Sequence, residues 1–175
     1  ISITLAPLVL ALTVRVTRDL GYAPSVLGLI LAAYGVGTVT GALVAARRIG
    51  RWRVAVVLIG GNLALGLSLI VLAVAAEIPV LLVVSAVAGV AQSMILLTYI
   101  TLRTAYSPDA LLGRIGSTAR SVSLGLQPIG LLVGGALTDA TSGSATVAVI
   151  GVVLAVASIV VLPVRALRSA TLVPR

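Results

Sequence analysis

Long apolar stretches divide this chain into segments that match the width of a lipid bilayer. Of its 175 residues, 60% are hydrophobic and only 9% are charged, which is more apolar surface than one soluble core of this length buries. A helix that crosses a membrane needs about 20 mainly apolar residues. The sequence therefore predicts an all-α, polytopic membrane protein with six transmembrane helices. They are expected at residues 1–14, 26–46, 54–76, 80–102, 113–138 and 145–162.

The first of these stretches is too short to cross a membrane, and we interpret it as the end of a helix. The segment 15–23 that follows is predicted to be a loop, because Gly21 and Pro24 are helix breakers. At 77–79 a tight turn is expected to join the third span to the fourth.

Arginine supplies all the positive charge of the chain and is distributed unevenly between its two predicted sides. The net charge of +8 arises from twelve arginines and four acids. One side holds ten of the arginines: Arg47, Arg48, Arg51, Arg53, Arg103, Arg114, Arg120, Arg165, Arg168 and Arg175. The other side holds Arg15 and Arg18. Because short arginine-rich loops stay in the cytoplasm, we predict that the first side and the C-terminus are cytoplasmic, in a plasma or inner membrane.

The remaining composition limits the chemistry of the chain. It contains no histidine and no cysteine, which excludes imidazole and thiolate metal sites and nucleophiles that depend on them. All four acids, Asp19, Glu77, Asp109 and Asp139, lie in or beside predicted loops. We therefore predict no enzyme activity, no metal and no cofactor. Nucleic-acid binding is not predicted, because the arginines lie between apolar spans and not along one face; the expected partner is the lipid bilayer.

The stretch 107–138 carries a polar stripe into an otherwise apolar helix. Its members lie three, four or seven residues apart and so share one helical face: Ser117, Arg120, Ser121, Leu124, Gln127 and Pro128. In the same helix Gly130 and Gly134 are four residues apart, and Gly37 and Gly41 repeat this spacing in the second span. Such small residues let membrane helices pack closely. A simple abundance of glycine is the alternative.

Three polar residues are candidates for the wall of a substrate cavity: Gln92, Tyr99 and Gln127. Buried polar groups in membrane helices are costly unless they face partners or water, so hydrogen bonds to neighbouring helices are an equally open interpretation. Arg114 and Arg120 are interpreted as residues of a cytoplasmic gate or as contacts to lipid headgroups, with simple snorkelling of the side chains as the alternative. We interpret Asn62 as a structural hydrogen-bonding residue.

The two halves of the chain are similar in their pattern of polarity. Spans two and five both carry small-residue seams, whereas spans three and six are the most apolar. Each half has three crossings and so the two have opposite orientations, which predicts two inverted three-helix repeats of the kind found in secondary transporters. Spans three and six are then expected to face lipid, unless the similarity is chance likeness between apolar triplets.

The run GALVAARRIGRWR after the second span resembles the cytoplasmic loop signature of the major facilitator superfamily. Arg48, Gly50 and Arg51 match the signature, whereas Arg47 stands at its acidic position and Leu43 at its first glycine. The runs LLGRIGS, QPIGLLVGG and GYAPSVLGLILAAYGVGTVTGAL are similar to the branch that includes macrolide and enterobactin exporters.

This resemblance implies that residues 1–171 form the C-terminal six-helix half of a transporter, equivalent to helices seven to twelve. The expected partners are an N-terminal six-helix half and a small-molecule substrate, and the expected activity is proton-coupled export of drugs or other amphipathic molecules by alternating access. Export of a siderophore or another metabolite is the alternative within the family, and a membrane scaffold or a half without activity of its own is the alternative outside it. Residues 172–175, LVPR, match part of a thrombin site and are interpreted as a possible expression-vector remnant.

Overall fold

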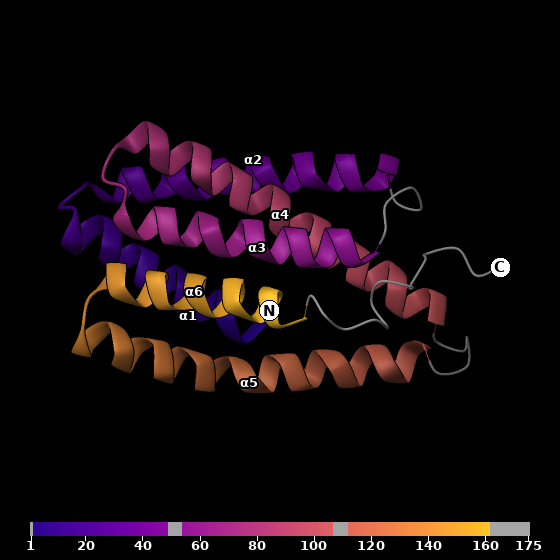
Figure 1. Cartoon of the computed structure of the whole chain (residues 1–175). Coiled ribbons are helices and arrows are strands. Elements are labelled where there is room, and N and C mark those ends of the chain that lie inside the picture. Colours follow the sequence, from indigo (N-terminus) through magenta and orange to yellow (C-terminus); the bar gives the residue numbers. More distant parts are fainter. Residues whose placement is uncertain (1, 49–53, 107–111, 162–175) are drawn as a thin grey trace.

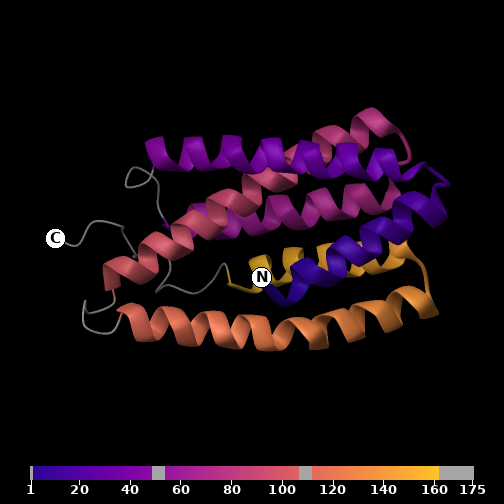
Figure 2. The ribbon, with the colours of Figure 1, turned by 180° about the vertical axis from the view of Figure 1, so that it is seen from behind.

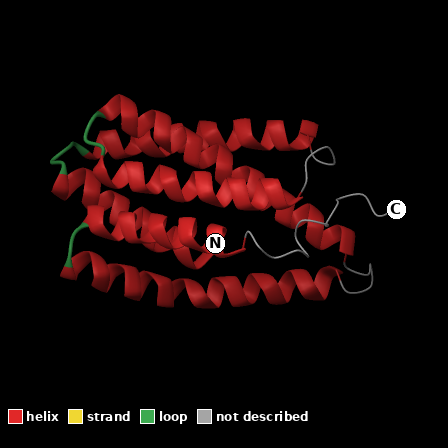
Figure 3. Cartoon of the chain, in the orientation of Figure 1, coloured by secondary structure: helices red, strands yellow, loops and turns green. Residues whose placement is uncertain are grey.

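The computed structural model of the protein describes residues 2–48, 54–106 and 112–161, and this part of the chain is helical almost throughout (Figure 3). The helices are α1 (Ser2–Val14), the π-helix η1 (Arg15–Asp19), α2 (Pro24–Arg48), α3 (Val54–Val74), α4 (Ile78–Tyr106), α5 (Leu112–Ala140) and α6 (Gly143–Val161). They lie roughly side by side, and α2 and α5 are at opposite edges of the group (Figure 1). The same order is seen from behind (Figure 2).

Within the described ranges, five helices are long and apolar enough to cross a membrane, namely α2, α3, α4, α5 and α6. The described part of α1 has 13 residues, fewer than a crossing requires. Large apolar side chains also cover the outside of the bundle: Val74 and Leu132 are each 74% exposed. Water does not favour so much continuous apolar surface, whereas lipid does, so the chain is a multi-pass membrane protein.

The helices pack in pairs that do not follow their order along the chain. α2 packs along α4, α1 along α5, and α3 along α6, while α3 also contacts α4 and α1 contacts α6. Their interior holds one main cluster of buried apolar side chains, which includes Leu12, Ile30, Leu69, Leu81 and Val147. The helices α1, α2 and α3 therefore pack mainly against α4, α5 and α6, and little against one another.

Two of these crossings depend on glycines at which the helix backbones nearly touch. A Cβ atom added at Gly41 of α2 would lie 2.6 Å from the carbonyl oxygen of Val90 in α4. Between α3 and α6 two glycines face each other. A Cβ added at Gly66 would lie 2.7 Å from the carbonyl oxygen of Gly151, and a Cβ added at Gly151 would lie 2.8 Å from the carbonyl oxygen of Gly66. No larger residue fits these positions without separating the helices.

The expected loop after α1 is wrong in its first part. Residues Arg15–Asp19 continue the helix as the π-helix η1, and the chain turns only afterwards, at Gly21, whose φ of +67° is a conformation that favours glycine. The polar run Arg15-Val16-Thr17-Arg18-Asp19 looks like a loop because it interrupts the apolar pattern. In the structure this run is helical. At its end the backbone N–H groups of Leu20 and Tyr22 donate to the carbonyl oxygens of Arg15 and Val16, at 3.0 Å each.

The position of α3 also differs from the expectation that the most apolar helices face lipid. One side of α3 is exposed, with Val56 at 64%, but the opposite side is buried against α4 and α6 through Leu65, Leu69 and Leu72. An apolar sequence suits lipid and a protein interior equally well, so hydropathy by itself does not separate the two environments.

Candidate functional site

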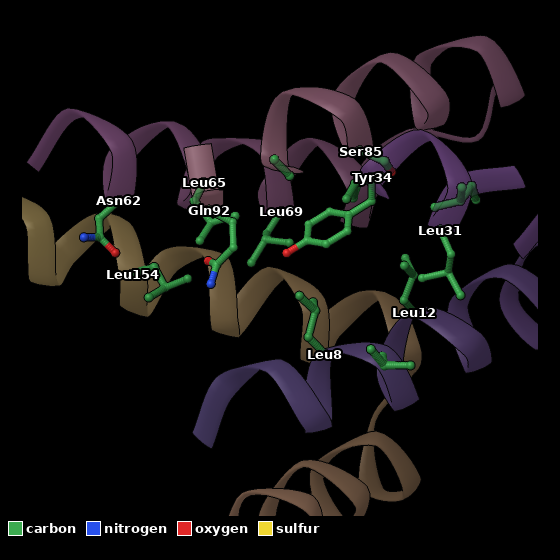
Figure 4. A pocket seen from close by; sticks show the side chains of 14 residues that line it. Leu8, Leu12, Leu31, Tyr34, Asn62, Leu65, Leu69, Ser85, Gln92 and Leu154 are labelled. Carbon is green, nitrogen blue, oxygen red and sulfur yellow. The ribbon is translucent and has the colours of Figure 1, made fainter. Parts of the chain in front are cut away.

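A cavity of about 70 Å³ lies inside the bundle, between α1, α2, α3, α4 and α6. Its wall is formed by Leu8, Val9, Leu12, Ile30, Leu31, Tyr34, Asn62, Leu65, Leu69, Leu72, Ser85, Ala88, Gln92 and Leu154. Most of these side chains are aliphatic, and Figure 4 shows them surrounding the ring of Tyr34 together with Gln92 and Asn62. The cavity is therefore an apolar chamber with a small number of hydrogen-bonding groups.

Helical spacing and the close α2–α4 crossing place these polar groups. Ser85, Ala88 and Gln92 are three and four residues apart and so line one face of α4. Gly89 lies on the adjoining face, where a Cβ would meet the backbone of Tyr34 and the amide nitrogen of Thr38. Because Gly89 has no side chain, α2 lies close against α4, and the base of the Tyr34 side chain lies close to this face of α4.

The polar side chains of the cavity differ in how their hydrogen-bonding capacity is used. The amide nitrogen of Asn62 donates to the carbonyl oxygen of Leu58 at 2.8 Å. Ser85 is buried, and its hydroxyl has no partner among the described residues. Within the same part of the chain, neither the hydroxyl of Tyr34 nor the amide of Gln92, which is 9% exposed, is hydrogen-bonded to another protein group. Helices α2 and α4 thus offer unused polar groups to one chamber.

None of the cavity-lining residues carries a charge at neutral pH. Asp19, Glu77 and Asp139, the acids that the structure describes, are exposed at helix ends. In this part of the chain no three acidic side chains come together to form a metal site. The cavity consequently has the means to bind and orient a molecule through shape and neutral hydrogen bonds, but it has no group that would exchange a proton near neutral pH.

The structure separates the three predicted cavity residues. Gln92 lines the cavity, but Tyr99 and Gln127 do not. Tyr99 is 46% exposed, and the guanidinium carbon of Arg103, one turn further along α4, lies 5.9 Å from the centre of its ring. Gln127 is half-buried on α5. Asn62, interpreted from the sequence as structural, both makes a hydrogen bond within its own helix and lines the cavity.

Three of the residues predicted for the gate and the loop are described, and they lie at the arginine-rich end of the bundle. Arg114 and Arg120 are exposed on α5, and Arg48 ends α2. Gly50 and Arg51 are outside the described residues, as are 172–175.

The predicted packing glycines lie at helix contacts where their surroundings are described. Gly37 faces the backbone of Ala86 in α4, Gly41 faces Val90, and Gly134 of α5 faces Pro7 of α1. Gly130 is half-buried. These positions are close enough for the predicted role in helix packing, which stays a prediction until stability is measured.

The end of the bundle opposite to the arginine-rich one is joined by hydrogen bonds between distant segments. Arg15, which is buried, donates from Nη2 to the carbonyl oxygen of Ala75 at 3.2 Å. The hydroxyl of Tyr22 donates to the oxygen of Ala76 at 2.8 Å. These bonds fasten the η1–α2 connection to the C-terminal end of α3.

Sequence reasoning missed Tyr34 and Ser85 as cavity residues. A usable signal exists for Tyr34, since the chain has only four tyrosines and one tryptophan and no phenylalanine, and an aromatic residue within a span rich in glycine and alanine needs space that its neighbours must leave. Ser85 gave no comparable signal, because serine is common in membrane helices.

Comparison with known families decides the class of the protein. A family model described as Major Facilitator Superfamily matches residues 1–175. This chain belongs to the major facilitator superfamily. Members of this superfamily are membrane transporters, in agreement with the five long apolar helices and the exposed apolar side chains of the described residues. No curated protein and no solved structure matches it.

Proposed function

We propose that this major facilitator chain forms one six-helix half of a secondary active transporter, built from the inverted repeats α1–α3 and α4–α6. The observation that carries the proposal is the crossed packing of the helices, in which α1 pairs with α5, α2 with α4, and α3 with α6. If α1, α2 and α3 are replaced by α4, α5 and α6 in that order, and the reverse, the same three pairs result. Two further contacts follow the same rule, since α1 with α6 becomes α4 with α3. This exchange is expected of an inverted repeat.

The partner in this proposal is an N-terminal six-helix half that covers α5. Only 11% of the most apolar stretch of α5 is buried within the chain. Its polar stripe includes Ser121, which is exposed, and Gln127, which is half-buried, whereas the Ser117 hydroxyl donates to the Arg114 oxygen of its own helix at 3.0 Å. Hydroxyl groups are poorly satisfied against lipid tails, so an aqueous cavity or a second protein surface is the environment that suits them.

The proposed activity is export of small amphipathic molecules by alternating access between the two halves. Gln92 and the polar groups around it contribute hydrogen bonds to substrate, and Tyr99 and Gln127 are proposed to face the surface between the halves. The described acids lie at helix ends, so we propose that the residue that couples transport to a proton gradient belongs to the partner half. A siderophore or another metabolite as substrate is the alternative that the transport experiment distinguishes.

Residues 1–171 are proposed to form this half, with the arginine-rich end and the C-terminus in the cytoplasm of a plasma or inner membrane. At that end Arg48, Arg114 and Arg120 are proposed to contact lipid headgroups or the cytoplasmic gate.

Transport requires both halves in this proposal, so the test is co-expression. Cells that express the chain together with an N-terminal half should expel a panel of fluorescent small molecules, whereas cells that express either part alone should not. In the paired system, Gln92→Ala should change the apparent affinity for some substrates by about 5-fold to 150-fold, the equivalent of one buried hydrogen bond worth about 1 to 3 kcal/mol.

Ser158→Ala is the matched control, because the Ser158 hydroxyl donates to the Leu154 oxygen of its own helix at 2.7 Å and Ser158 does not line the cavity. Export by the chain without a partner would replace the half-transporter by a self-associating six-helix exporter. A pair that reaches the membrane but moves nothing would favour a scaffold.

Orientation has a separate test, made simple by the absence of cysteine. Ala76 and Ala105 are both exposed, and they lie at opposite ends of the bundle because Ala76 precedes the start of α4 and Ala105 lies at the end of this helix. An impermeant thiol reagent added outside intact cells should label Ala76→Cys and spare Ala105→Cys. Preferential labelling of Ala105→Cys would reverse the proposed orientation.

A further inference from the structure

The polar groups of the cavity are uncharged, and part of their hydrogen-bonding capacity is unused. Tyr34 and Gln92 come from facing helices, and Asn62 reaches the cavity from α3. Asn62 uses one donor on Leu58, which leaves its carbonyl oxygen and its second N–H group unused by the described protein. A phenol and two primary amides together offer both donors and acceptors. Such a set complements a ligand group that is itself uncharged and able to donate, accept or do both.

Charged ligand groups do not suit this chamber. An ion that leaves water needs an opposite charge or several oriented hydrogen bonds to replace its hydration. The residues that line the cavity include no acid and no arginine, and most of the wall is leucine, isoleucine or valine. A cation or an anion would therefore lose its hydration without a counter-charge, whereas a neutral amide or hydroxyl group exchanges water for Tyr34 and Gln92 at little cost.

The cavity is also open on one side. Val9 of α1 and Leu31 of α2 both belong to its wall, and they are 44% and 40% exposed. The opening between these helices is lined by aliphatic side chains, which favour contact with a hydrocarbon chain. A volume of about 70 Å³ suits the polar end of a molecule whose aliphatic part extends outward through the opening.

We infer that this cavity binds the uncharged amide, hydroxyl or carbonyl end of an aliphatic molecule, which enters between α1 and α2. The polar end contacts Tyr34 and Gln92, with Asn62 next to them, and the aliphatic part lies against Leu8, Leu12 and Leu31. The identification of this molecule as a transported substrate rests on the proposed function, but the binding itself does not.

The test compares three probes of equal chain length with different charge at pH 7: hexanamide, hexylamine and hexanoate. The full chain is reconstituted in lipid nanodiscs, and its melting temperature is measured with each probe. At about five times its dissociation constant, a bound probe should raise the Tm by about 2 to 4 °C. Hexanamide should produce this rise, and the cationic and anionic probes should not.

Variants separate binding in the cavity from general effects of amphiphiles on the bilayer. Tyr34→Phe removes only the phenolic oxygen and should abolish most of the hexanamide shift; Gln92→Met, which keeps the side-chain length, should do the same. Tyr22→Phe is the matched control, since the Tyr22 hydroxyl bonds to Ala76 outside the cavity. Its melting temperature without probe should fall slightly, but its hexanamide shift should equal that of the wild type.

Equal shifts with all three probes would overturn the inference, as would a hexanamide shift that survives in both Tyr34→Phe and Gln92→Met. No shift with hexanamide up to its solubility limit would also overturn it and would leave a cavity that holds only water. If the hexanamide shift behaves as expected but the chain paired with an N-terminal half exports nothing, the proposed function fails and the binding site stands. If the paired chain exports substrate but hexanamide causes no shift, the proposed function stands and the inferred binding site fails.

Discussion

Helices α3 and α5 are both long and apolar enough to cross a membrane but are supported in different ways. α3 has only two polar side chains, Asn62 and Ser68, in 21 residues. In its most apolar stretch, 39% of residues are buried within the chain, against 11% for α5. The helix with the more polar face is therefore the one that the chain covers least.

The difference indicates what each helix requires from its surroundings. A uniformly apolar helix is stable against protein on one side and lipid on the other, so α3 needs no additional cover. α5 carries hydroxyl and amide groups that lipid does not satisfy, and within the described chain it packs mainly on the short helix α1. We infer that α3 needs no protein contacts beyond those within this chain, and that α5 packs against a further protein surface, which the proposed second half would provide.

The largest expected effect concerns one glycine on each helix. Gly66→Ala places a Cβ 2.7 Å from the Gly151 oxygen of α6, whereas Gly125→Ala on α5 has open space around it. The first change should lower the free energy of unfolding by about 1 to 3 kcal/mol through overpacking. The second should raise it by up to about 1 kcal/mol, because alanine favours a helix over glycine. Unfolding of the purified chain in mixed micelles measures both.

The two substitutions are chemically identical, so each is a control for the other. A destabilisation of similar size at both positions would mean that the chain alone already encloses α5, and it would remove the contrast with α3.

A second test asks whether a partner covers the polar stripe of α5. Ser121 is exposed on that stripe, and Leu67 is 52% exposed on the outer side of α3. Co-expression with the N-terminal half should slow labelling of Ser121→Cys by a membrane-permeable maleimide by about tenfold, which is about 1.4 kcal/mol of protection. Leu67→Cys should be labelled at the same rate with and without the partner. Unchanged labelling of Ser121→Cys would argue that this face of α5 contacts lipid in the assembled protein.

The smallest expected effect lies where α5 does bond to the rest of the chain. The Thr138 hydroxyl lies 3.1 Å from that of Thr146 in α6, and both residues are buried. Hydrogen bonds between membrane helices contribute about 0.6 kcal/mol on average, so Thr146→Val should lower the Tm by about 1 to 3 °C. Thr141→Val is the control, because the Thr141 hydroxyl bonds only to the Leu137 oxygen of its own helix. Equal shifts would mean that the link between α5 and α6 adds no stability.

The positions of the membrane helices were largely predictable, because apolar length and breakers such as Pro24 act locally. The expected second span at 26–46 lies inside α2, Pro24–Arg48, and the expected fourth at 80–102 lies inside α4, Ile78–Tyr106. These two helices are longer than expected because polar residues at the ends of a span remain helical outside the hydrocarbon. Hydropathy marks the bilayer core and does not mark the helix end.

The cavity was less predictable, because it depends on which helices face each other. Gln92 was identified from polarity and Tyr34 was not, although both line the same space. The contact between Gly66 and Gly151 was also missed, because neither glycine belongs to a regular small-residue repeat in its own helix. The two residues meet only where α3 crosses α6. Periodicity reports the faces of one helix, whereas a cavity or a crossing joins faces of several.

The backbone N–H of Ser144, at the start of α6, donates to the carboxylate of Asp19 at 2.9 Å, and these partners are 125 residues apart in the chain. A ribosome adds about 5 to 20 residues per second, so roughly 6 to 25 s separate the synthesis of one partner from that of the other. Throughout that interval η1, whose first residue is the buried Arg15, lacks the α6 contacts that complete this end of the bundle. The η1 segment therefore reaches its final surroundings only after α6 has been made.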